Sequence, residues 1–114
     1  MPATAVFDEN ILLKRLGNNR ALLAELVQIF LEEGPRNLEN IAEGITKNDL
    51  PAVRMASHTL KGSLDYFGIA TAIALAETIE KQAKIGQLHE VAQNFGELEK
   101  VVRLLLAELR VVGS

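Results

Sequence analysis

Residues 91–112 read VAQNFGELEKVVRLLLAELRVV, and their apolar residues recur in alternating steps of four and three. The series consists of Val91, Phe95, Leu98, Val102, Leu105, Leu109 and Val112. Residues at this spacing share one face of an α-helix, here over about three heptads. The spacing predicts a helix that buries one side in a helical bundle. A dimeric coiled coil through the same face is the alternative.

Two helices are predicted at the start of the chain. Asp8 can cap a short helix that ends at Gly17, with Phe7 placed to pack on Leu12. A long helix over about 19–47 follows, because its apolar residues keep one face before and after Pro35. We expect a kink where Pro35 removes a backbone donor, and two helices broken at this proline are the rival interpretation.

Two more helices precede the last one. Asn48 and Asp49 form a turn and cap, and the helix that follows runs to about Phe67 and stops at Gly68. The next helix is closed by Gly86, and its apolar face holds Ile69, Ala72, Ile73, Ala76, Ile79 and Ala83. The predicted fold is all-α: an antiparallel up-down-up-down four-helix bundle with a short N-terminal capping helix, forming a single domain over residues 1–114.

Composition excludes several function classes. The net charge of −3 argues against a nucleic-acid partner, and the absence of cysteine excludes disulfides and thiolate chemistry. The apolar runs are too short to span a bilayer, and the first ten residues do not resemble a secretory signal. We therefore expect a cytoplasmic chain with no membrane and no nucleic-acid partner.

The segment at residues 56–68, ASHTLKGSLDYFG, carries the candidate chemistry. The apolar stripe of its helix centres on Leu60, and His58 lies roughly 160° away, facing outward. Lys61 and Gly62 are the neighbours of His58 on the same face, one turn further along. Lysine offers positive charge to a phosphoryl group on the imidazole. Glycine costs about 1 kcal/mol in mid-helix, but leaves room for another backbone to approach.

The stretch ASHTLKGS, with Gly68 ten residues after the histidine, resembles the signature of histidine-containing phosphotransfer (HPt) domains. These are monomeric helical bundles that relay phosphoryl groups between receiver-domain aspartates. The resemblance implies that His58 is the phosphoacceptor, Lys61 the phosphate-stabilising cation and Gly62 the clearance residue. It also implies a phosphoryl carrier, not an enzyme, whose partners are receiver domains of response regulators or hybrid histidine kinases. No cofactor is expected, since Mg²⁺ would belong to the receiver.

The resemblance extends to the following helix, where a polar residue often hydrogen-bonds the imidazole. Glu80 occupies the matching position, and Lys84 one turn later would add positive charge. The alternative is that Glu80 and Lys84 form an ordinary surface ion pair. The chain departs from the family pattern at Asp65 and Tyr66, where small residues are common, which bears on partner choice.

The sequence also suggests a docking patch and two alternative functions. The expected docking patch combines Met55 with Leu12 or Leu13 of the capping helix. One rival function is a non-enzymatic adaptor that binds a partner helix through Leu104 and Leu106, with His58 incidental. Another is a haem or metal site at His58, which its cationic neighbours disfavour. The other histidine, His89, is expected to be solvated, and no nucleotide-binding glycine loop is present.

Overall fold

Five helices make up the part of the chain that the computed structural model describes, residues 7–112. They are α1 (Glu9–Arg15), α2 (Arg20–Thr46), α3 (Leu50–Phe67), α4 (Ala70–Lys84) and α5 (Leu88–Val112). The described residues form no strand, so the all-α prediction is confirmed. The predicted domain also covered residues 1–6 and 113–114, which lie outside the described residues. None of the described helices is both long enough and apolar enough to cross a membrane.

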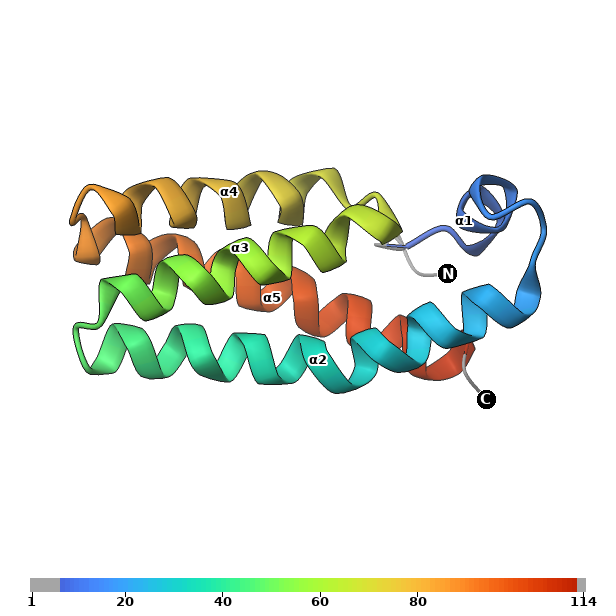
Figure 1. Cartoon of the computed structure of the whole chain (residues 1–114), viewed down its shortest axis with the longest axis horizontal. Helices are drawn as coiled ribbons and strands as arrows, with labels where there is room; N and C mark the ends of the chain where they lie inside the picture. The colour runs from blue at the N-terminus through green and yellow to red at the C-terminus, as the bar shows by residue number, and fades with distance from the viewer. Residues whose placement is uncertain (1–6, 113–114) are drawn as a thin grey trace.

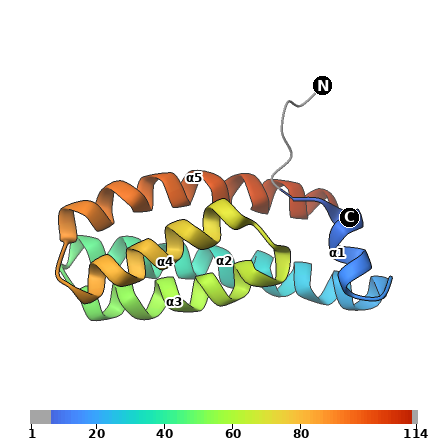
Figure 2. The same cartoon turned by 90° about the horizontal axis from the view of Figure 1, so that it is seen from above.

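The four long helices run alternately up and down, side by side (Figure 1). α3 packs against α2 and α4, and α5 packs against the same two helices, so that the four close into a bundle. The short helix α1 lies at the end of the bundle where α2 begins and α3 ends (Figures 1 and 2). This arrangement confirms the predicted bundle with its capping helix.

Local capping groups fix where the helices begin and end. The carboxylate of Asp8 accepts hydrogen bonds from the first free amides of α1, and Asp49 does the same for Ala52 in α3. α3 stops because Gly68 adopts the left-handed conformation, with φ of 65°, which costs glycine nothing. The distal glycine of the sequence pattern therefore ends the histidine helix and turns the chain back into α4.

The second helix is continuous. α2 runs without interruption from Arg20 to Thr46 and contains Pro35, so the interpretation with two separate helices is wrong. Near its end, Gly44 lets α3 approach closely: a Cβ atom there would lie 2.7 Å from Cγ2 of Val53. The missing side chain thus sets how tightly α2 and α3, the helix that carries His58, pack together.

Aliphatic side chains fill the centre of the bundle. From the heptad series of α5, Leu98, Val102 and Leu105 are fully buried against the other helices. The face proposed for a coiled coil therefore serves the chain's own core. At the α1 end, the ring of Phe67 makes edge-to-face contacts with Phe7 and Phe30, at centroid distances of 5.8 and 5.3 Å. These contacts attach the segment before α1 to the end of the histidine helix.

Candidate functional site

His58 lies on the solvent face of α3. Its side chain is 67% exposed, whereas Leu60 and Leu64 on the opposite face of the helix are fully buried. Ser57, the residue before the histidine, is buried, and its hydroxyl donates to the carbonyl of Val53. The buried stripe therefore fixes the rotation of α3 and holds the imidazole outward, in the direction that the helical wheel predicts.

Glu80 of α4 contacts two candidate side chains of α3, His58 and Lys61. Its Oε2 atom lies 2.9 Å from Nδ1 of His58, and its Oε1 atom accepts a hydrogen bond of 3.2 Å from Nζ of Lys61. The three side chains come from two adjacent antiparallel helices, so their geometry depends on the packing of α3 on α4. The sequence prediction named all three, and the structure brings them together in one cluster.

The charge on Glu80 decides how the imidazole is arranged. Burial raises the pKa of this carboxyl, but its hydrogen bond and attraction to Lys61, together with those to His58, outweigh burial, and the pKa lies below its ordinary value. An ionised carboxylate can only accept hydrogen bonds, so Nδ1 of His58 must carry the hydrogen. In a neutral imidazole the lone pair then lies on Nε2, the nitrogen on the other side of the ring.

The surroundings of Gly62 are open. A Cβ atom added at this position would meet no atom within 4 Å. The residue lines a hollow between α3 and α1, together with Leu12, Arg15, Leu16, Asp65 and Tyr66. No packing contact within the described part of the chain requires glycine here, although glycine in mid-helix costs about 1 kcal/mol relative to alanine.

The remaining predicted site residues lie at the edge of this cluster. Lys84 is exposed and, among the residues described, makes no ion pair or hydrogen bond, so the alternative pair with Glu80 is not formed. Asp65 and Tyr66 are both exposed and line the hollow beside Gly62. His89 is exposed near the start of α5, as expected.

Three apolar residues that the sequence offered for partner contact, Leu12 or Leu13 for docking and Leu106 for the adaptor alternative, are buried. Leu12 and Leu13 are only 3% and 4% exposed, because α1 turns its apolar face onto the end of the bundle. The predicted docking patch therefore keeps only Met55, which is 73% exposed. Leu106 is 1% exposed, which leaves Leu104 as the surface residue of the adaptor alternative. Leu106 is buried because it faces the bundle, as Leu105 and Leu109 of α5 also do.

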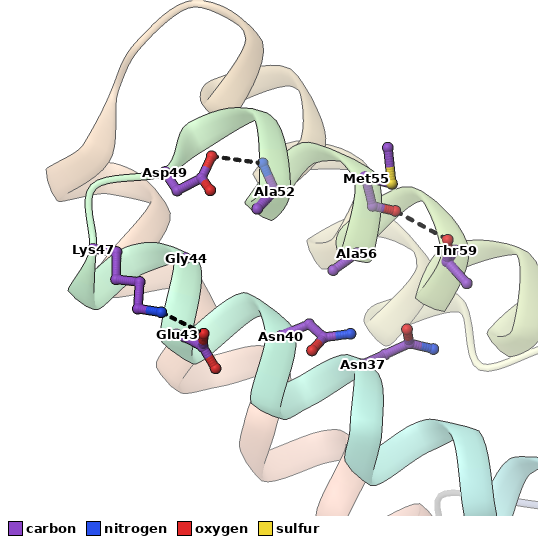
Figure 3. Close-up of a pocket in the computed structure, with 10 residues that line it drawn as sticks. All are labelled: Asn37, Asn40, Glu43, Gly44, Lys47, Asp49, Ala52, Met55, Ala56 and Thr59. Atoms are coloured by element: carbon purple, nitrogen blue, oxygen red, sulfur yellow. Dashed lines mark hydrogen bonds and ion pairs between the residues drawn. The ribbon is translucent and has the colours of Figure 1, made fainter.

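A polar groove beside the histidine escaped the sequence analysis. It lies between α2 and α3 (Figure 3). Met55 and Thr59 line both this groove and the hollow around His58. Asn37 and Asn40 of α2 line the groove opposite α3, and Nδ2 of Asn37 is buried with no hydrogen-bond partner among the residues that the structure describes. Asn37 was the available signal, because an asparagine at a position that also packs inward breaks the apolar pattern of α2.

Comparisons with known proteins agree with the geometry. The chain is similar to histidine-containing phosphotransfer protein B (HptB) from Pseudomonas aeruginosa PAO1, at 16% identity and a TM-score of 0.85, covering 98% of this chain and 96% of that one. It is also similar to the HPT domain of an Hpt sensor hybrid histidine kinase from Shewanella, at 20% identity and a TM-score of 0.65, covering 91% and 96%. At these identities the likenesses show the fold.

The family assignment comes from the sequence. No curated protein gives a significant match. The family model for the Hpt domain matches residues 25–111, which includes His58, Lys61, Gly62 and Glu80. That match spans most of the chain, which therefore belongs to the Hpt domain family, whose members serve as phosphotransfer modules in phosphorelays.

Proposed function

We propose that this chain accepts a phosphoryl group on His58 from the aspartyl phosphate of a receiver domain and passes it to another receiver. The observation that carries the proposal is the hydrogen bond between Nδ1 of His58 and the carboxylate of Glu80. It leaves Nε2 as the free nucleophile of an imidazole that is 67% exposed.

The transfer is an in-line displacement at phosphorus. The lone pair of Nε2 forms the N–P bond while the P–O bond to the receiver aspartate breaks, and the aspartate leaves as a carboxylate. The receiver supplies Mg²⁺. Lys61 lies on the same helix face and offsets charge on the phosphoryl oxygens. The reverse reaction follows the same path, so one site serves both donor and acceptor.

Docking of the receiver uses the face that surrounds the histidine. The hollow beside Gly62 offers room for a visiting backbone, since no atom of the described residues 7–112 would meet a Cβ there. Met55 and Tyr66 offer exposed apolar surface on the same helix. Asp65 adds a negative charge there, and we propose that it favours receivers with a basic residue at the matching position.

The test is a phosphotransfer screen against the receivers of the source organism. Each purified receiver is phosphorylated and mixed with the chain, and acid-labile label on the chain is measured over time. We expect rapid transfer from at least one receiver, loss of transfer in His58→Gln, and unchanged transfer in His89→Gln. Label that persists in His58→Gln would refute the site, and absence of transfer from every receiver would refute the function.

A further inference from the structure

The charges at the histidine balance before phosphorylation, and a phosphoryl group upsets this balance. Lys61 donates to Glu80 at 3.2 Å, and its side chain is only 25% exposed, so its positive charge already has a partner. A phosphoryl group at neutral pH brings a charge of about −1.5 to −2 to His58. If Lys61 turns to the phosphoryl group, Glu80 loses its cation. These three side chains therefore leave one anionic group uncompensated.

Arg54 is the cation best placed to fill this deficit. It precedes His58 by one helical turn on the exposed face of α3. Its guanidinium makes no hydrogen bond or ion pair with any residue in the described part of the chain. It lines a hollow of about 410 Å³ around the imidazole, together with Pro51, Met55, His58, Thr59 and Glu80. Lys84 of α4 and Arg15 of α1 are also exposed cations, but neither lines this hollow.

We propose that Arg54 binds the phosphoryl group on His58 together with Lys61, whose ammonium is shared between the phosphoryl group and Glu80. This assignment rests on the proposed function and adds a second phosphoryl-binding side chain to it. The guanidinium is planar and presents several N–H donors, which suits it to two oxygens of one phosphoryl group. Arg54 precedes His58 on the helix and Lys61 follows it, so the two cations would approach the phosphoryl group from opposite ends of α3.

The test uses a small phosphoryl donor, so that receiver docking plays no part. In a His89→Gln background, phosphoramidate phosphorylates His58: Nε2 forms the N–P bond, the P–NH₂ bond breaks, and ammonia leaves after taking up a proton from water. The phosphorus NMR shift of the product is then followed against pH. Arg54→Gln should raise the pKa of the bound phosphoryl group by about 0.5 unit, because a nearby exposed cation favours the dianion.

Matched variants separate the possible outcomes. Arg54→Lys should restore most of the difference, and Arg110→Gln, which removes the same charge from an exposed position in the last turn of α5, should leave the titration unchanged. An Arg54→Gln titration equal to that of the parent overturns the assignment, even if transfer from a receiver slows, since Arg54 would then contact only the receiver. Absence of phosphoryl on His58 in the parent overturns the proposed function as well.

Discussion

The carboxylate of Glu80 lies 2.9 Å from Nδ1 of His58, across the contact between α3 and α4. The same carboxylate accepts from Lys61, so one residue of α4 orients two residues of α3. The orientation of the imidazole therefore depends on how the following helix packs against α3, and each of the three side chains can be tested separately.

Glu80→Ala should allow the imidazole of His58 to adopt both neutral tautomers. Without an acceptor at Nδ1, the hydrogen distributes over both ring nitrogens, and phosphotransfer should fall about tenfold, the scale of one charge-assisted hydrogen bond. Nitrogen NMR of the imidazole measures the tautomer, and receiver assays measure the rate. Glu77→Ala is the matched control, because Glu77 is exposed on the same helix and pairs with Lys81 instead. An unchanged tautomer in Glu80→Ala would contradict the positioning role.

Lys61→Gln should raise the pKa of Glu80. Burial raises this pKa, and Lys61 is the strongest opposing influence, ahead of His58, so removing Lys61 takes away the largest influence that lowers the pKa. Carboxyl carbon NMR over an acid titration measures the change, and His58→Gln should produce a smaller rise. A larger effect from His58→Gln would show that Lys61 is not the main partner.

The lowered pKa of Glu80 also predicts how the stability of the fold changes in acid. Because the folded pKa of Glu80 lies below the ordinary value of 4.5, its stabilising contribution is present above that value and is lost as pH falls through the folded pKa. Lys61→Gln should therefore reduce the stability difference between neutral pH and acid. Urea unfolding at both conditions measures it, with Lys81→Gln as an exposed control. An equal difference in the parent and Lys61→Gln would contradict the prediction.

Gly62 and Gly96 have similar surroundings, so substitutions at Gly96 are the control for substitutions at Gly62. Both lie inside helices, and a Cβ atom at either position would meet nothing within 4 Å. Alanine at either position should stabilise the chain by about 0.5–1 kcal/mol. A bulkier glutamine should slow receiver transfer at position 62 and leave it unchanged at position 96. Equal transfer rates in the two glutamine variants would show that the space beside His58 is not used.

Gly44→Ala should lower the unfolding free energy, in contrast to alanine at position 62 or 96. Its Cβ atom would lie 2.7 Å from the side chain of Val53 and 3.2 Å from the carbonyl oxygen of Asp49. Val53 is fully buried and cannot move away, so we expect a loss of about 1–3 kcal/mol in unfolding free energy. Urea denaturation measures this, and a variant as stable as the parent would mean that α2 and α3 can separate at no cost.

Helix identity and order could be predicted from the sequence because each helix has its own periodic face and end signals. Asp8, Asp49 and Gly68 act locally, so their effects are visible in a few residues of sequence. The continuity of α2 through Pro35 was predicted because its apolar residues keep one face on both sides of the proline. The wheel of α3 likewise predicted that His58 faces solvent.

The features that could not be predicted from the sequence depend on how the helices pack together. Leu12 or Leu13 was expected in the docking patch because periodicity does not say which side of a short end helix meets the bundle, and both are buried. Leu106 was misassigned because α5 is buried over a wider arc than its heptad series suggests. The polar groove with Asn37 forms only when α2 and α3 pack together, so neither helix predicts it alone.

The nitrogen that carries the phosphoryl group tests the central claim most directly. The chain, labelled with nitrogen-15 and phosphorylated by a receiver, is examined by NMR for coupling between phosphorus and each ring nitrogen of His58. Since Nδ1 faces Glu80, we expect the coupling at Nε2. A phosphoryl group on Nδ1, or on any residue other than His58, would contradict the account.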